Sequence, residues 1–198
     1  MTGPSAAAAT RRLFVAVNLA VDIRQSLATV VAPLRVTERA VSWVAEPNLH
    51  LTLRFLGEQP AKLVAELSRA LRDVGGQVPA HELILGAFGA FPSLRRPRVL
   101  WLGVSANVAS ASLYQKVDDA CAALGLSREA REFHPHVTLG RVRPRATLAP
   151  ATLVEAARLL DTTWTTAVTT VDLMSSRLGS GGARYECLVA APLTGPGR

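Results

Sequence analysis

The sequence predicts an α+β fold made of two similar lobes that face each other across a cleft. Short apolar strands alternate with amphipathic helices along the chain. The order strand, helix, strand occurs twice, and the second copy follows the first at a constant offset. Phe14 and Leu100 are 86 residues apart, and His50 and His136 are also 86 residues apart. We interpret this offset as an internal repeat.

The first half of the chain contains strands and helices in alternation. Residues 13–19 are rich in β-branched and aromatic side chains, which is typical of a buried strand. Asp22 can cap a helix over about residues 22–34, in which apolar residues recur at helical spacing. A further helix is predicted over about 62–74, and a strand over 82–88.

Between these elements, residues 49–56 alternate between apolar and polar side chains, which predicts a strand with one buried face and one polar face. The buried face would carry Leu49, Leu51, Leu53 and Phe55, and the polar face His50, Thr52 and Arg54.

The second half repeats this order. The pattern predicts strands at 99–105, 136–139, 165–174 and 184–190, helices at 110–124 and 152–160, and a hairpin turn at 179–182. We expect one domain over residues 11–193, a disordered leader over 1–10 and a flexible tail over 194–198. The leader does not resemble a secretory signal, so we expect a cytoplasmic protein.

Composition and charge narrow the class of protein. The 198 residues are 49% hydrophobic, enough for a real core, and no apolar run approaches the roughly 20 residues that span a bilayer. Two cysteines are too few for a disulfide scaffold or a thiolate zinc site. The net charge is +7, and all basic residues except Lys62 and Lys116 are arginines. An arginine-rich surface favours an anionic partner such as nucleic acid, although codon bias in a GC-rich genome explains it equally well.

The repeat also duplicates a polar motif, His-x-Thr-Leu. It occurs at residues 50–53 and again at 136–139. Because side chains alternate along a strand, the histidine and the threonine of each copy share one face. Two such strands would bring two imidazoles and two hydroxyls into one cleft. One neutral imidazole can remove a proton and the other, protonated, can supply one, while the hydroxyls donate to phosphate oxygens. This set suits a phosphodiester substrate.

The chain resembles the two-histidine (2H) phosphoesterases, in particular the bacterial RNA 2',3'-cyclic phosphodiesterases, also known as LigT-like proteins or 2'-5' RNA ligases. The resemblance extends from Arg12 to about Leu193. Besides the two motifs it includes RLFVAV at 12–17, NLHLTLRFLGE at 48–58, GAFPSLRRPRVLWLGV at 89–104 and FHPHVTLGR at 133–141.

This resemblance implies a bilobal, pseudo-two-fold pair of antiparallel sheets with outer helices. It implies hydrolysis of an RNA 2',3'-cyclic phosphate to a 2'-phosphomonoester without a metal or other cofactor. A secondary 2'-5' ligation would arise by reversal or by attack of a 5'-hydroxyl in place of water. His50 would be the proton donor and His136 the proton acceptor, although the pseudo-symmetry leaves swapped roles open. Thr52, Thr138 and Arg141 would bind the phosphate. We expect RNA ends, tRNA halves among them, as partners of a monomer.

Further residues have a functional and an ordinary interpretation. Phe88, Phe91 and Trp101 could stack on a base or pack in the core, and Phe91 is the best stacking candidate. Arg95, Arg96 and Arg98 could contact RNA or form a solvated loop. His134 lies two residues before His136, but Pro135 interrupts the strand and no further His or Cys lies nearby in sequence. We therefore predict RNA contact for His134 and no metal site.

Two other functions remain open at this stage. The chain could be a 2H phosphoesterase that acts on a small cyclic nucleotide or an ADP-ribose cyclic phosphate. It could also be an RNA-end-binding module without turnover, although binding alone would not require both histidines.

Overall fold

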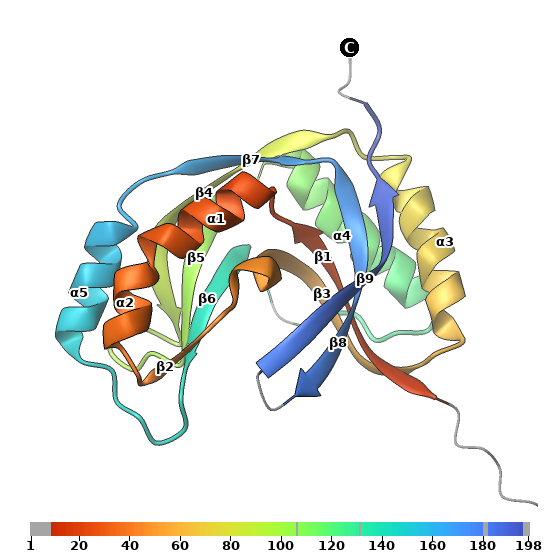
Figure 1. Cartoon of the computed structure of the whole chain (residues 1–198). Coiled ribbons are helices and arrows are strands. Elements are labelled where there is room, and N and C mark those ends of the chain that lie inside the picture. The colour runs from red at the N-terminus through yellow and green to blue at the C-terminus, as the bar shows by residue number, and fades with distance from the viewer. Residues whose placement is uncertain (1–8, 106, 131, 180–181, 196–198) are drawn as a thin grey trace, which may run out of the picture.

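The computed structural model describes residues 9–105, 107–130, 132–179 and 182–195. Within these residues nine antiparallel strands form one sheet, which curls into an arch (Figure 1). The strand order is β7-β4-β5-β6-β3-β1-β8-β9, and β2 pairs with β6. Helices α3 and α4 lie beside one half of the arch, and α1, α2 and α5 lie beside the other (Figure 1). No helix among the described residues is long and apolar enough to cross a membrane.

The elements of the first half follow the predicted order. They are β1 (Thr10–Asn18), α1 (Val21–Val30), α2 (Ala32–Thr37), β2 (Val41–Trp43), the short 3-10 helix η1 (Glu46–Asn48), β3 (His50–Pro60), α3 (Leu63–Gly75) and β4 (His81–Phe91). The second half contains β5 (Val99–Ser105), α4 (Val108–Ala123), β6 (His136–Val142), α5 (Pro150–Leu159), β7 (Trp164–Val168), β8 (Thr170–Gly179) and β9 (Gly182–Pro192).

The two halves of the sequence exchange strands. β4, from the first half, pairs with β5, and β8, from the second half, pairs with β1. Each lobe of the arch therefore contains strands from both halves of the chain. The lobes meet where β3 and β6 pair through Leu51 and Val137.

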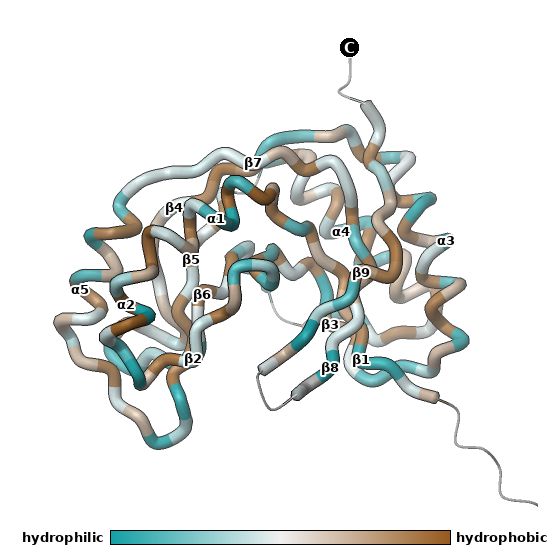
Figure 2. Tube along the Cα trace, viewed as in Figure 1, coloured by the Kyte–Doolittle hydropathy of each residue, from teal (hydrophilic) through white to brown (hydrophobic). Residues whose placement is uncertain are grey.

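The main core lies between the sheet and the helices. Leu51 and Val137 belong to it, together with Leu27 of α1, Leu71 of α3 and Leu113 of α4, all of them buried. In Figure 2 apolar and polar residues alternate along the helices as well as the strands, as expected for elements that bury one side. The opposite side of the sheet, which we call the open face, carries the polar residues of the repeated motif.

The structure differs from the sequence prediction at several element boundaries. The helix predicted over 22–34 is divided at Val31, since Pro33 cannot donate to the carbonyl four residues before it. Helix α4 begins earlier than predicted because Asn107 caps it, accepting a 2.9 Å hydrogen bond from the backbone N–H of Ser110. The short β2 was not predicted, and the strand predicted over 165–174 is divided into β7 and β8.

Backbone pairing extends slightly beyond the domain predicted over residues 11–193. β1 begins at Thr10, inside the segment predicted as a leader. Thr194, in the predicted tail, accepts a hydrogen bond at its carbonyl from the Ala80 N–H and donates its own N–H to Val78. The predicted hairpin turn includes residues 180 and 181, which lie outside the described residues, and the flanking Gly179 and Gly182 pair as expected.

Candidate active site

The two copies of the motif lie on the strands that join the lobes. Because Leu51 and Val137 pair and point into the core, His50 and Thr52 of β3 and His136 and Thr138 of β6 lie on the open face. Half-buried, buried and exposed side chains follow one another in the same order along residues 50–56 and along residues 136–142. The repeat inferred from sequence is therefore also a repeat of side-chain environment.

A β-bulge interrupts each motif strand just after the threonine. In β3, Thr52 pairs with Ala16 and Arg54 pairs with Val15, so Leu53 is the extra residue. Because a bulge breaks the alternation, Arg54 is buried on the helix side and Phe55 is 61% exposed. The prediction that placed Arg54 on the polar face and Phe55 on the buried face is therefore wrong.

The same bulge in β6 determines where Arg141 lies. Thr138 pairs with Trp101 and Gly140 pairs with Leu100, which leaves Leu139 as the extra residue. Strict alternation would put Arg141 on the side opposite to His136 and Thr138. The bulge brings it to the open face instead, where its charge acts on the His136 ring. The structure thus brings His136, Thr138 and Arg141 together.

The His50 ring is held at both nitrogens. Its Nδ1 lies 2.7 Å from the carbonyl oxygen of Asn48, and its Nε2 lies 2.9 Å from Oγ1 of Thr52. A carbonyl can only accept, so Nδ1 must donate and the neutral ring has its lone pair on Nε2. Nε2 is then the nitrogen that exchanges a proton.

His136 has the matching arrangement. Its Nδ1 lies 2.7 Å from the carbonyl oxygen of His134, two residues before it, as Asn48 is two residues before His50. By the same reasoning Nδ1 donates and Nε2 is the reactive nitrogen. The two rings therefore have the same tautomer in their neutral forms.

Burial lowers the pKa of both histidines below the ordinary value of 6.5. For His50, the bond to Asn48 opposes this effect, and the charge of His136 lowers the pKa further. For His136, the bond to the His134 carbonyl raises the pKa, while the positive charges of Arg141 and His134 lower it. The charge of His136 acts on His50, so two imidazolium ions at once are disfavoured.

Aromatic side chains surround both histidines. Phe14 and Tyr185 pack against His50, with ring centroids 5.0 Å and 5.3 Å from its own. Phe91 lies 5.0 Å from His136, and Trp101 lies 6.2 Å from it. Of the three aromatic residues considered from the sequence, only Phe88 packs against the core clusters, while Phe91 and Trp101 lie beside the candidate site.

A glycine makes room for Trp101. A Cβ atom on Gly89 would lie 2.2 Å from Cη2 and Cζ2 of the indole, much closer than atoms can approach. Gly89 and Trp101 are paired in register on β4 and β5, so the indole lies directly over the glycine. This position requires a residue without a side chain.

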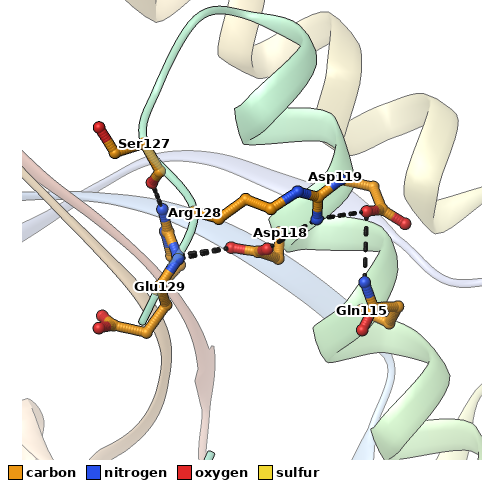
Figure 3. Close-up of polar contacts among 7 residues, drawn as sticks. Gln115, Asp118, Asp119, Ser127, Arg128 and Glu129 are labelled. Carbon is orange, nitrogen blue, oxygen red and sulfur yellow. Dashed lines mark hydrogen bonds and ion pairs between the residues drawn. The ribbon is translucent and has the colours of Figure 1, made fainter. Parts of the chain in front are cut away.

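A buried charge cluster connects β3 to the segment that precedes His136. Nη1 of Arg54 lies 2.5 Å from Oδ1 of Asp118 on α4, and Nη2 of Arg54 donates to the Ser127 carbonyl. Asp118 also accepts from the Glu129 backbone N–H at 3.3 Å and from Nη1 of Arg128 at 3.0 Å. Figure 3 shows these contacts between α4 and the loop after it, continued by Asp119 and Gln115.

The remaining predicted contacts lie at the edge of the site. His134 is exposed, with its ring centroid 6.4 Å from that of Phe91. Arg95, Arg96 and Arg98 are exposed in the loop between β4 and β5, and the backbone N–H of Arg98 donates to the Phe91 carbonyl at 2.7 Å. Among the described residues, no three His, Cys, Asp or Glu side chains gather where they could hold a metal ion.

Three residues near His50 were not singled out from the sequence. Tyr185 comes from β9. Asn18 and Asp172 are far apart in sequence, and Nδ2 of Asn18 donates a 2.7 Å hydrogen bond to Oδ2 of Asp172. Asn18 pairs with His50 in the β1–β3 register. Asp172 and Tyr185 lie near His50 because β1 pairs with β8, more than a hundred residues away in sequence, and no local pattern in the sequence signals such a pairing.

The sequence and the fold of this chain are both similar to those of known proteins. Residues 23–179 match the family model described as the 2'-5' RNA ligase superfamily. The chain belongs to this superfamily. It is 33% identical over 191 residues to an RNA 2',3'-cyclic phosphodiesterase of Escherichia coli, an alignment that covers 93% of this chain and 97% of that protein. The fold also matches the crystal structure of E. coli LigT complexed with 3'-AMP, with a TM-score of 0.70 and 32% identity, over 94% of this chain and 99% of that one.

Not every member of the superfamily aligns over its full length. An RNA 2',3'-cyclic phosphodiesterase of Geobacillus stearothermophilus is 33% identical over 128 residues, which are 65% of this chain but only 41% of that protein. This chain therefore spans less than half the length of that relative. The bilobal antiparallel fold expected from the resemblance is confirmed by the LigT structure.

Proposed function

We propose that this protein hydrolyses the 2',3'-cyclic phosphate at the end of an RNA and leaves a 2'-phosphomonoester. The observation that carries this proposal is the duplicated arrangement of His50 and His136, in which Nδ1 of each ring is bound to a backbone carbonyl, so that Nε2 is the nitrogen that exchanges a proton. The relatives named RNA 2',3'-cyclic phosphodiesterase support the same reaction.

The reaction requires one proton to be removed and one to be supplied. Nε2 of His136 takes a proton from water, whose oxygen forms a bond to phosphorus. The bond from phosphorus to O3' breaks, and Nε2 of His50 gives its proton to O3'. The product has a 2'-phosphate and a 3'-hydroxyl. After reaction His50 is neutral and His136 is protonated, so His136 must release a proton and His50 must take one up before the next cycle.

Electrostatics supports this division of roles. The positive charges of Arg141 and His134 favour the neutral form of His136, which a base requires. Burial lowers the pKa of His50 in any case, and a neutral His136 removes the further lowering that its charge would cause. The mutual effect of the rings thus disfavours the state in which both carry a proton, in which His136 could not act as a base.

Thr52, Thr138 and Arg141 would bind the non-bridging oxygens of the phosphate. Hydroxyl and guanidinium donors on the open face stabilise the negative charge that accumulates there during attack. The same displacement, with an RNA 5'-hydroxyl in place of water, would form a bond from O5' to phosphorus, break the bond to O3' and leave a 2'-5' linkage. Neither reaction in this scheme uses a metal ion.

Because the relatives are named for RNA 2',3'-cyclic phosphates, we propose RNA ends with a cyclic phosphate, tRNA halves among them, as substrates of a monomeric cytoplasmic enzyme. Phe91 and His134 lie next to His136 and would contact the terminal nucleotide. Arg95, Arg96 and Arg98, in the loop that follows Phe91, would contact the RNA backbone.

Separate His50→Ala and His136→Ala variants test the scheme, with a cyclic-phosphate-ended oligonucleotide as substrate. Each should lose at least about a hundredfold in kcat, because each removes one proton transfer. Near wild-type turnover by either variant would contradict the paired roles. Wild-type activity should persist in EDTA, and a loss that a divalent ion restores would contradict the metal-free scheme. A cyclic mononucleotide or ADP-ribose cyclic phosphate hydrolysed far faster than the RNA would identify a different substrate.

A further inference from the structure

A basic cavity lies at the end of β1, β3 and β8 that is farther from His50. Its volume is about 470 Å³. It is lined by Ala9, Thr10, Arg11, Arg12, Glu58, Ser175, Ser176 and Arg177. Three arginines and one glutamate leave a net positive charge, and three hydroxyl groups add neutral donors. Guanidinium and hydroxyl groups together are the donors that bind phosphate oxygens.

The cavity is linked to the candidate active site by the open face of β1. Phe14 contacts the His50 ring, and Arg12 is two residues further along the same strand, on the same face. Two residues of a strand cover about 7 Å. Ser176 pairs with Arg12 and also with Tyr185, the second aromatic neighbour of His50. Phe14 is itself buried under Tyr185, so an RNA that leaves His50 over Tyr185 reaches Arg12 and Ser176 next.

The acidic groups at the cavity are few. Glu58 pairs with Arg12 in register, and Glu186 lies 3.7 Å from Arg11 in an exposed ion pair. Such an exposed pair contributes little and is readily replaced by a phosphate. Arg177 and Arg12 are both exposed. The cavity thus offers two exposed guanidinium groups to an anion from solvent.

We propose that this cavity is a second anion subsite, which binds a backbone phosphate of the RNA on the 5' side of the cyclic end. The proposal rests on the proposed function for the direction of the strand. The subsite makes the enzyme prefer an oligonucleotide over a cyclic mononucleotide, since only the longer substrate reaches Arg12. The contribution of the subsite to RNA affinity should fall as the salt concentration rises, because each phosphate contact releases counterions.

The test uses cyclic-phosphate-ended substrates of one, two and four nucleotides with the wild-type protein and the double variant Arg12→Gln/Arg177→Gln. We expect kcat/KM of the wild type to rise with length. The double variant should lose about tenfold for the tetranucleotide and change less than about twofold for the mononucleotide. Its salt dependence should also become shallower. Arg69→Gln, which removes an exposed arginine from α3, is the matched control and should change nothing.

Two further measurements make the outcome decisive. Glu58→Gln removes the carboxylate and should raise kcat/KM for the tetranucleotide. Equal losses for all three substrates, or no loss in the double variant, would overturn the subsite.

Binding of a tetranucleotide that ends in a 2'-phosphate, measured by fluorescence anisotropy, does not require catalysis. Length-dependent binding that the double variant loses, without hydrolysis by the wild type, would support the subsite and contradict the proposed function.

Discussion

Phe55 and Arg141 occupy corresponding positions, 86 residues apart, and each reaches the open face through a β-bulge after its His-x-Thr motif. The repeat is therefore symmetric in its backbone and asymmetric in the side chain it presents. One lobe offers an aromatic ring at this position, and the other offers a guanidinium group. This difference breaks the symmetry between the two histidines, because only His136 has a permanent positive charge acting on it from this position.

The first prediction concerns this charge. Arg141→Gln should lower kcat/KM for a cyclic-phosphate RNA by about a hundredfold, since it removes a charged donor to the phosphate. It should also raise the pKa of His136, whose protonated form Arg141 disfavours, and move the acidic limb of the pH–rate profile to higher pH. Steady-state kinetics from pH 5 to 9 measures both effects. An unchanged acidic limb would show that His136 is not the base whose titration limits the rate.

The pH dependence of the unmodified enzyme follows from the two lowered histidine pKa values. The base must be neutral and the acid protonated, so kcat/KM should give a bell whose centre lies below the ordinary histidine value of 6.5. A bound phosphate stabilises the imidazolium form and should move the kcat profile to higher pH. Profiles of kcat/KM and kcat that coincide, or a bell centred well above neutrality, would contradict this account.

The same pKa shifts act on the stability of the fold. The unfolded chain binds protons that the folded rings exclude, so the free energy of unfolding should decrease as the pH falls below 6.5. His50→Ala should weaken this dependence. Urea unfolding at a series of pH values measures it.

A glycine substitution tests the contact between Gly89 and Trp101. Gly89→Ala would place a Cβ atom 2.2 Å from the indole, so Trp101 must move away from its position beside Phe91 and His136. We expect a changed tryptophan emission spectrum and a loss of about tenfold or more in kcat/KM. Gly76→Ala is the matched control, because its Cβ atom would be 3.6 Å from the nearest atom. Normal activity in Gly89→Ala would mean that Trp101 does not help to position His136.

The buried pair of Arg54 and Asp118 gives a prediction about stability. Arg54→Met leaves a buried carboxylate without its main partner and should cost about 3–5 kcal/mol of unfolding free energy. Arg54→Met/Asp118→Leu removes both charges and should recover most of this loss. Denaturant unfolding of both variants measures the difference. A double variant as unstable as the single one would show that the ion pair itself, and not the unpaired charge, accounts for the stability.

These residues also show how much of the molecule could be predicted from the sequence. His50 and His136 could be predicted as site residues because the repeat makes a local pattern occur twice, and β5 was predicted with its observed bounds. The sides of the sheet on which Arg54 and Phe55 lie could not be predicted. One extra residue in a strand reverses the alternation and leaves no mark in the pattern of apolar residues. Tyr185 and Asp172 depend on pairings between distant strands, which local periodicity does not specify.

The most direct measurement is the identity of the product from an RNA with a 2',3'-cyclic phosphate end. The wild-type protein in EDTA should convert it completely to a 2'-phosphate with a free 3'-hydroxyl, as detected by phosphorus NMR of a short oligonucleotide. His50→Ala and His136→Ala should each leave the cyclic phosphate intact on the same time scale. A 3'-phosphate product, an unreacted substrate with the wild type, or product formation by either histidine variant at the wild-type rate would contradict the account.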